Sequence, residues 1–224
     1  MAMDSIPDLP SLIDELTELY GTAPPPFPTD PFELVLWENV AYLASDKRRR
    51  EAFESLRATV GTRPEQILAA SREQLVAVAS HGILAEGFGA KLRSAAEIAL
   101  GEFDGDLEEV VARPVASAKQ ALRRFPGIGE PGAEKILLFL RRHPFLAPES
   151  NGLRVLVRLG VCPDGANYAA TYAAAREMAQ QQLGDDLDLL LTARYCLRRH
   201  GKELCRRKAP SCGACALNQA CPFP

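Results

Sequence analysis

The chain has 224 residues, enough for one large or two small domains with a buried core. Hydrophobic residues make up 47% of it, no stretch approaches a membrane span, and Met1–Asp4 lacks the positive flank of a secretory signal, so we expect a cytoplasmic protein. The formal net charge of −3 does not by itself indicate a nucleic-acid-binding protein, although local charge distribution matters more than the sum.

The hydrophobic pattern predicts helices throughout and no period-two strand, so the fold class is all-α. Leu12, Ile13, Leu16 and Leu19 mark a first helix that Gly21 ends. Pro31 starts an apolar helix that we expect to run to about Ala44. Further helices are expected near 48–59, 64–69, 72–79, 88–101, 115–124, 149–159, 168–182 and 187–199. Basic residues cluster at 47–50, 123–124, 141–142, 198–199 and 206–208, and acidic residues at 4–18, 102–109 and 185–188.

Four cysteines lie close together near the end of the sequence, in the pattern C-x6-C-x2-C-x5-C: Cys205, Cys212, Cys215 and Cys221. Four thiolates this near in sequence can converge on a tetrahedral sulfur site, which suits an iron–sulfur cluster or zinc. Zinc knuckles usually use two short cysteine pairs, and only Cys212 and Cys215 are paired that way. Disulfides are the third possibility, disfavoured in a reducing compartment. Cys162 and Cys196 lie outside this spacing and are expected to be buried free thiols.

A glycine-rich turn, Phe125-Pro126-Gly127-Ile128-Gly129, separates two of the predicted helices, the second resuming at about Gly132. Glycine permits backbone angles and close approaches that other residues block. Exposed amides in such a turn, beside a helix N-terminus, form an anion site for which a DNA phosphate is a natural ligand. An ordinary glycine-rich helical turn is the alternative.

The run His200–Cys205, the basic residues Arg206, Arg207 and Lys208, the other three cysteines and the glycine turn together resemble the endonuclease III superfamily of helix-hairpin-helix DNA glycosylases. The resemblance covers about Pro31 to Pro222. It implies two helical lobes with a DNA-binding cleft: a barrel over 29–143, and a second lobe from 1–28 and 144–224.

The same resemblance implies a [4Fe-4S] cluster in the loop 205–221, with the four cysteines as its ligands. It also implies that the helix-hairpin-helix turn binds DNA through Gly127, Ile128 and Gly129. The loop that the cluster stiffens would present Arg206, Arg207 and Lys208 to the same DNA.

The sequence departs from the family at its catalytic positions. Where bifunctional members carry a nucleophilic lysine, this chain has Pro131, which has no nucleophile. Lys135 stands one helical turn on, about 6 Å along the axis, either as a displaced nucleophile or as a solvated flank of a core helix. Glu149 stands where the family has aspartate, and we expect it to stabilise the sugar cation and position water. The alternative role of Glu149 is to cap the helix that begins near Ser150.

A second candidate catalytic carboxylate, Glu38, lies on the apolar helix that begins at Pro31. It falls where mismatch-adenine glycosylases place the acid that protonates the departing base. A salt bridge to an arginine is the structural alternative. Trp37 is expected to pack in the core rather than stack on a base. Leu43 occupies the position of a glutamine that wedges into the duplex in endonuclease III, and an apolar side chain can also wedge.

The sequence therefore predicts a monomeric base-excision-repair DNA glycosylase acting on double-stranded DNA, nucleoid-associated if bacterial, with Glu149 and Glu38 as catalytic residues. It predicts a monofunctional enzyme. The alternatives are a bifunctional glycosylase/lyase that uses Lys135, a non-catalytic DNA-structure-binding protein, and a zinc-dependent interaction module.

Overall fold

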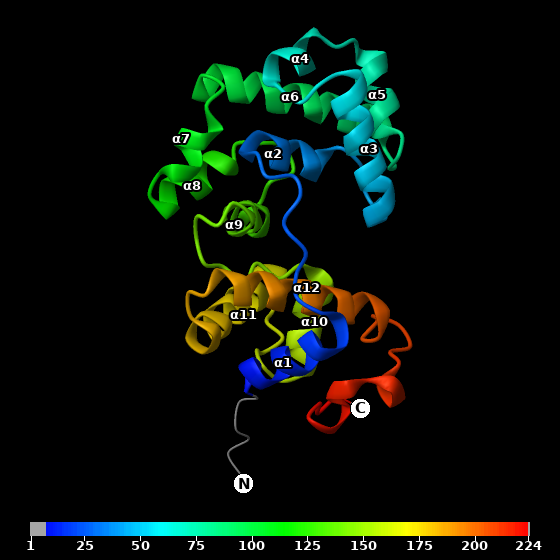
Figure 1. The fold of residues 1–224 in the computed structure, drawn as a ribbon, viewed down its shortest axis with the longest axis vertical. Helices are drawn as coiled ribbons and strands as arrows, with labels where there is room; N and C mark the ends of the chain where they lie inside the picture. Colours follow the sequence, from blue (N-terminus) through cyan, green and yellow to red (C-terminus); the bar gives the residue numbers. More distant parts are fainter. Residues whose placement is uncertain (1–7, 224) are drawn as a thin grey trace. The chain divides into compact units, whose positions relative to one another are not determined.

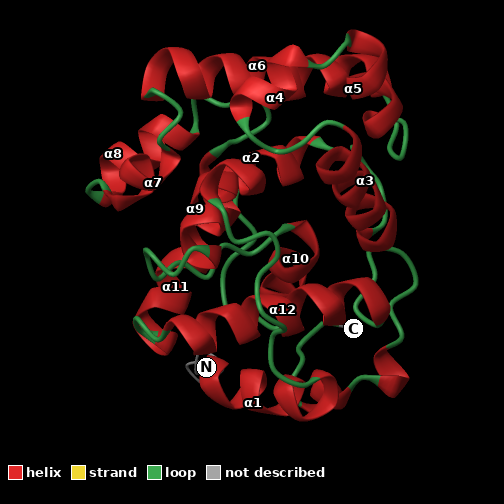
Figure 2. Ribbon diagram, turned by 45° about the horizontal axis from the view of Figure 1, so that its top comes forward, coloured by secondary structure: helices red, strands yellow, loops and turns green. Residues whose placement is uncertain are grey.

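The computed structural model describes residues 8–223, and within that range the fold contains helices and loops but no strand (Figure 2). The all-α prediction is therefore confirmed. The sole β-type pairing in the described range is an isolated antiparallel bridge between Tyr42 and Ile83. No helix in this range is both long and apolar enough to cross a bilayer.

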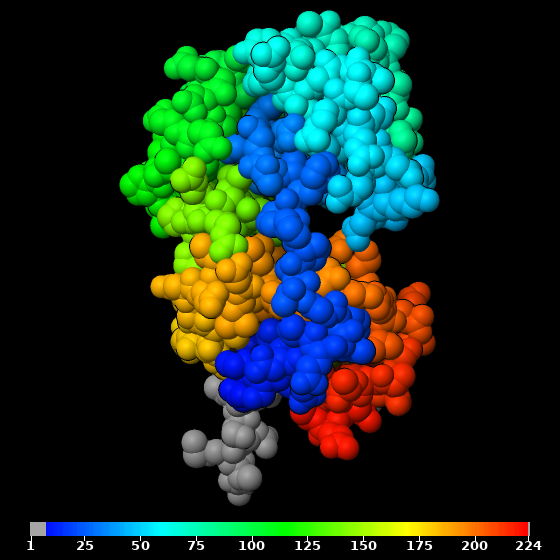
Figure 3. All heavy atoms as spheres, in the orientation of Figure 1, coloured from blue at the N-terminus to red at the C-terminus, as the bar shows by residue number. Residues whose placement is uncertain are grey.

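The chain divides into two compact units. One contains residues up to Pro25 and those from His143 onward. Its helices are α1 (Leu9–Tyr20), α10 (Ser150–Arg158), α11 (Tyr168–Leu183) and α12 (Leu187–Glu203), followed by the 3₁₀ turns η1 (Cys212–Ala214) and η2 (Ala216–Gln219) (Figure 1). The space-filling view shows the C-terminal segment beside α1 on the surface of this unit (Figure 3).

The other unit comprises Pro26–Arg142. Its helices are α2 (Pro31–Asn39), α3 (Asp46–Thr59), α4 (Pro64–Ala69), α5 (Arg72–Ala79), α6 (Ala85–Phe103), α7 (Leu107–Ala112), α8 (Val115–Leu122) and α9 (Glu130–Phe139). Helix α6 packs against α4, α5 and α2. Trp37 is only partly buried. It contributes to an aromatic cluster in this unit through edge-on contacts with Phe27 and Phe53, so it packs at the edge of the core rather than within it.

Helix starts follow the capping chemistry of the sequence. Asp30 accepts a hydrogen bond from the Glu33 amide at 2.8 Å, with Pro31 at the first helical position. Asp106 caps α7 in the same way, through the Glu109 amide at 2.9 Å. We did not predict α7, because we treated 102–109 as an acidic segment. The apolar Leu107, Val110 and Val111 are buried, and they hold this short helix in place.

Helix α2 ends at Asn39, five residues before the predicted Ala44. The buried Asn39 side chain donates to the Val35 carbonyl, at 3.1 Å, within the last turn. The chain then leaves the helix: Tyr42 joins the bridge to Ile83, and Leu43 takes a left-handed conformation with φ of 52°. The residues after Asn39 are apolar because they form this loop contact, not because the helix continues. Their apolar pattern therefore led us to predict a longer helix.

Helices α10 and α12 cross closely at Gly201. A Cβ atom there would lie 2.4 Å from the carbonyl oxygen of Asn151, a backbone atom that cannot move independently of α10. The crossing therefore requires a residue without a side chain at position 201.

We predict that Gly201→Ala lowers the free energy of unfolding by about 1–3 kcal/mol, the usual cost of overpacking a well-packed contact. Denaturant unfolding measures the change. Gly101→Ala is the control, because a Cβ at this α6 position meets nothing within 4 Å. It should stabilise the protein by about 0.5–1 kcal/mol through its better helix propensity. Equal stability of the wild type and Gly201→Ala would contradict the proposed close crossing.

Candidate functional site

The glycine turn connects α8 to α9. Gly127 adopts a left-handed φ of 74°, and a Cβ there would lie 3.0 Å from the Asn39 side-chain oxygen. Asn39 also donates to the Pro126 carbonyl at 2.9 Å, so α2 holds the turn in place. Its Oδ1 atom is buried without a hydrogen-bond partner among the described residues. Sequence patterns did not indicate this contact, because Asn39 and Pro126 are 87 positions apart.

The three residues of the turn predicted to bind DNA differ in exposure. Gly127 and Gly129 are exposed, whereas the Ile128 side chain is 5% exposed and belongs to the core. Ile128 can thus offer a ligand only its backbone. Gly129 is the N-cap of α9 and supplies no side-chain hydrogen bond to the first amides of that helix. These amides and the helix dipole form a suitable environment for an anion.

Ion pairs, one of them to a buried carboxylate, join the two helices of the hairpin. Lys119 on α8 contacts Glu134 on α9 at 2.7 Å and also pairs with Glu130, and Glu134 is fully buried. Arg123 contacts Glu130 at 3.4 Å. The charges fix the separation of α8 and α9, and therefore the shape of the turn between them.

Glu38 and Lys135 form an ion pair between α2 and α9. Their side chains are 16% and 18% exposed, and Lys135 Nζ lies 2.5 Å from Glu38 Oε2. The sequence-based alternative for Glu38 was a bridge to an arginine; the structure shows an ion pair with a lysine. Pro131 lies in the first turn of α9, where proline is readily accommodated.

Glu149 is the N-cap of α10. Its Oε1 atom accepts hydrogen bonds from the amides of Asn151 and Gly152, both at 3.0 Å, and its Oε2 accepts one from the Asn151 side chain at 2.8 Å. Capping and catalysis are alternative roles for this residue, but the capping bonds also orient the carboxylate. Tyr168, which we did not predict, is a neighbour: partial burial raises the pKa of its phenol, and the negative charge of Glu149 raises it further.

The α10 helix also holds the cysteine loop. Arg154 donates to the carbonyl oxygens of Cys205 at 2.9 Å and Gly201 at 2.6 Å, and to Asn151 Oδ1 at 3.0 Å. One chain of hydrogen bonds therefore links Glu149, Asn151, Arg154 and the start of the loop. Burial is the main cause that lowers the pKa of Arg154.

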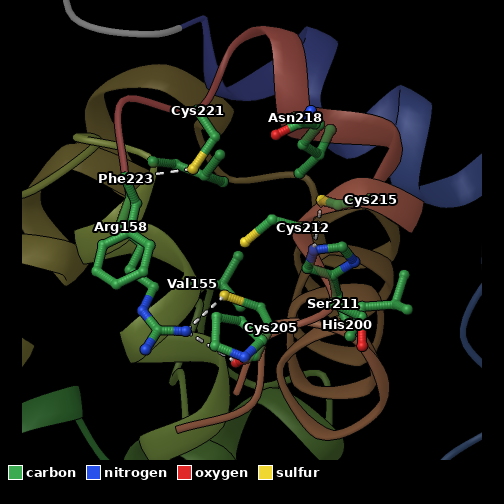
Figure 4. Close-up of a pocket in the computed structure, with 14 residues that line it drawn as sticks. Val155, Arg158, His200, Cys205, Ser211, Cys212, Cys215, Asn218, Cys221 and Phe223 are labelled. Carbon is green, nitrogen blue, oxygen red and sulfur yellow. Dashed lines mark hydrogen bonds between the residues drawn. The ribbon is translucent and has the colours of Figure 1, made fainter. Parts of the chain in front are cut away.

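The four predicted cysteine ligands line one cavity (Figure 4). Apolar walls come from α10, α12 and η2, including Val155, Leu159 and Leu217. All four thiols are free, and burial is the first cause that raises the pKa of Cys215. Cys162 and Cys196 are free and buried, as expected, and neither lines the cavity.

The donor set around this cavity fits an iron–sulfur cluster. Four soft sulfur donors share an apolar recess, where an Arg158 N–H group donates to one sulfur and a ring nitrogen of His200 contacts another. Within residues 8–223, no three His, Cys, Asp or Glu side chains are grouped to hold one metal ion. A cubane cluster does not require that grouping, since each thiolate binds a different iron.

The basic side chains of the loop, Arg206, Arg207 and Lys208, are exposed. Their backbone is restrained, because Arg158 donates to the carbonyls of Arg206 at 2.9 Å and Arg207 at 3.4 Å. The loop can therefore present three positive charges on a backbone whose conformation is held by Arg158.

A second set of exposed groups is apolar. Leu43 is 72% exposed, and Ile83 and Leu84, which we did not predict as site residues, are 52% and 66% exposed. The Tyr42–Ile83 bridge joins their two loops. Leu43 and Leu84 both have left-handed backbones, with φ of 52° and 57°. These two leucines combine an unfavourable backbone conformation with an apolar side chain exposed to water. That combination is typical of a binding surface.

The predicted site residues fall into two groups. The hairpin turn, Glu38 and Lys135 belong to the unit Pro26–Arg142, whereas Glu149, the cysteines and the basic loop belong to the other.

No family model matches the sequence, and no curated protein matches it. Solved structures do match the fold. A non-covalent endonuclease III–DNA complex has a TM-score of 0.77 at 17% identity, covering 96% of this chain and 94% of that chain. A thermostable thymine-DNA glycosylase has a TM-score of 0.74 at 15% identity, covering 96% of each chain. The 3-methyladenine DNA glycosylase MagIII of H. pylori, bound to 1,N6-ethenoadenine, has a TM-score of 0.68 at 15% identity, covering 88% of this chain and 98% of that chain. The chain thus has the all-α fold of the helix-hairpin-helix DNA glycosylases.

Proposed function

We propose that the protein is a monofunctional DNA glycosylase of base-excision repair that hydrolyses the glycosidic bond of a damaged or mismatched base in double-stranded DNA. The observation that carries the proposal is the oriented carboxylate of Glu149, in a fold that matches endonuclease III over 96% of the chain. The uncapped amides of the hairpin support the same function, because they suit a DNA phosphate.

Glu149 would act on the sugar. Breaking the glycosidic bond develops positive charge there, and a fixed carboxylate stabilises that charge without reorganising. The same carboxylate can orient a water molecule, whose oxygen bonds to the sugar carbon as the glycosidic bond to the base breaks, while Glu149 accepts the proton that the water loses. The three hydrogen bonds that Glu149 accepts hold it ready for both roles.

Glu38 and Lys135 would act on the leaving base, which needs a proton. Their contact modifies the role expected of Glu38 alone, because an ammonium bonded to a carboxylate supplies a shared proton that can pass to the base. Leu43 and Leu84 would enter the space that an extruded base leaves in the stack.

The cysteine quartet would hold a [4Fe-4S] cluster. Bound there, the cluster would join Cys205, which follows α12, to the cysteines around η1 and η2, fixing the basic loop between them. Absorbance near 400 nm and about four irons per chain test this assignment, and one zinc ion per chain would replace it with a zinc site.

Glu149→Gln tests the catalytic proposal. We expect base release from a panel of lesion-containing duplexes, detected by alkaline cleavage of the abasic product, to fall about 100-fold or more, the usual loss on removing one electrostatic stabiliser. Duplex affinity should change little. Glu177→Gln, on α11 of the same unit, is the matched control. If the wild type releases no base from the whole panel yet binds duplexes, the chain is a non-catalytic DNA binder instead.

The alternative of lyase chemistry through Lys135 has one observation in its favour: the lysine contacts a carboxylate that could take up its proton. We expect no borohydride-trapped protein–DNA adduct, because the same pairing stabilises the ammonium, which is not a nucleophile. An adduct that forms with the wild type, and is lost in both Lys135→Ala and Lys135→Arg, would establish the bifunctional enzyme.

The basic loop predicts a salt-dependent contribution to duplex binding. Replacing Arg206, Arg207 and Lys208 by glutamine should weaken binding and reduce the slope of log affinity against log salt by about 0.9 for each phosphate that the loop no longer neutralises. Replacing the exposed basic cluster Lys47, Arg48 and Arg50 serves as the comparison. An unchanged slope would remove the loop from the DNA-binding surface.

A further inference from the structure

Two side-chain nitrogen atoms lie close to two different sulfurs of the cysteine quartet. Arg158 Nη1 lies 3.3 Å from Cys205 Sγ, and His200 Nε2 lies 3.4 Å from Cys215 Sγ (Figure 4). Both residues line the cavity, and the glycosylase proposal assigns no role to either contact.

Arg158 is held in place from several sides. Its guanidinium lies 4.2 Å from the centroid of the Phe223 ring, and it donates to the backbone carbonyl of Arg206 at 2.9 Å. The Phe223 ring covers one face of the guanidinium. The N–H groups of the guanidinium point at the loop and at Cys205. The donor is therefore fixed toward the sulfur rather than free to turn into solvent.

His200 is 2% exposed and makes a contact through each ring nitrogen. Its Nδ1 atom lies 3.2 Å from the Tyr20 hydroxyl, and its Nε2 atom faces Cys215. A metal-bound thiolate only accepts hydrogen bonds, so Nε2 must carry the hydrogen. In a neutral imidazole, Nδ1 is then an acceptor, and the phenol of Tyr20 donates to it.

The environment of this chain agrees with those proton positions. Burial is the main cause that raises the pKa of Tyr20 to about 12, so the phenol keeps its proton at neutral pH. Helix α1 thereby contributes, through Tyr20, to a contact at the opposite end of the sequence.

We propose that Arg158 and His200, the latter oriented by Tyr20, are positioning residues that stabilise the cluster by donating hydrogen bonds to the Cys205 and Cys215 thiolates. The inference rests on the proposed [4Fe-4S] cofactor. Donors to a thiolate offset its negative charge, which is greater when the cluster carries one more electron. They therefore raise the reduction potential of the cluster, and, because Arg158 and His200 are themselves fixed, they hold the two sulfurs in position and slow the loss of these ligands from iron.

The test uses the full chain with its cluster. Arg158→Met removes the donor and the charge but keeps an unbranched side chain against Phe223. Tyr20→Phe removes only the hydroxyl and keeps the ring that Arg199 covers. The matched controls are Lys202→Met, which removes a positive charge from the last turn of α12, and Tyr195→Phe, which removes a phenol bonded to Arg199.

Two quantities are measured: the midpoint potential of the one-electron couple of the cluster, by titration with redox mediators, and the rate at which a chelator bleaches the absorbance near 400 nm. We expect Arg158→Met to shift the potential to more negative values and to speed bleaching several-fold. Tyr20→Phe should shift both in the same direction by less, because His200 then no longer favours one tautomer. Neither control should change the potential.

The outcomes separate this inference from the function on which it rests. If the wild type binds a cluster, and Arg158→Met and Tyr20→Phe keep its potential and bleaching rate, the inference fails and the glycosylase proposal stands. If the wild type binds no iron, the cofactor assignment and the inference both fail. If Arg158→Met does not fold, Tyr20→Phe decides, since it changes one atom outside the cavity lining.

Discussion

The hydrogen bonds of helix α10 organise one whole unit of the protein. At its N-terminus the helix amides orient the carboxylate of Glu149. One turn later Arg154 holds the carbonyls at the end of α12, and one turn beyond that Arg158 holds the carbonyls of the basic loop. The candidate catalytic group, the cysteine cavity and the basic loop are thus fixed to a single nine-residue rigid element.

The hairpin in the other unit is organised by charge rather than by backbone contacts alone. Lys119 pairs with Glu130 and with the fully buried Glu134, so removing Lys119 takes an ion-pair partner away from a carboxylate in the core; breaking a buried pair typically costs about 3–5 kcal/mol. Asn39 adds a link from α2 to the turn. A well-defined turn is needed because a phosphate site made of backbone amides has no flexible side chain to correct an error in position.

Most of the helices and the fold resemblance could be predicted from short local patterns in the sequence. Proline, capping residues and apolar periodicity indicated the helices, and the cysteine spacing and glycine turn indicated the fold resemblance that the solved structures support. Contacts between distant segments could not be predicted in this way. Glu38 with Lys135, Asn39 with Pro126 and Tyr20 with His200 are separated by 97, 87 and 180 positions, and no single sequence contains a signal that pairs them. Helix α7 was missed for a different reason, because its charged surface masked the three buried residues that hold it.

The two left-handed leucines have a thermodynamic implication for the isolated protein. At Leu43 and Leu84 the chain combines an unfavourable backbone with large apolar groups in water. Asparagine or glycine would relieve both costs, so these loops are less stable than their positions permit. A partner that covers the leucines would remove their apolar surface from water. The free energy of the loops would therefore fall on binding. If these leucines enter DNA as proposed, part of the stabilisation of the two loops is supplied by the bound duplex.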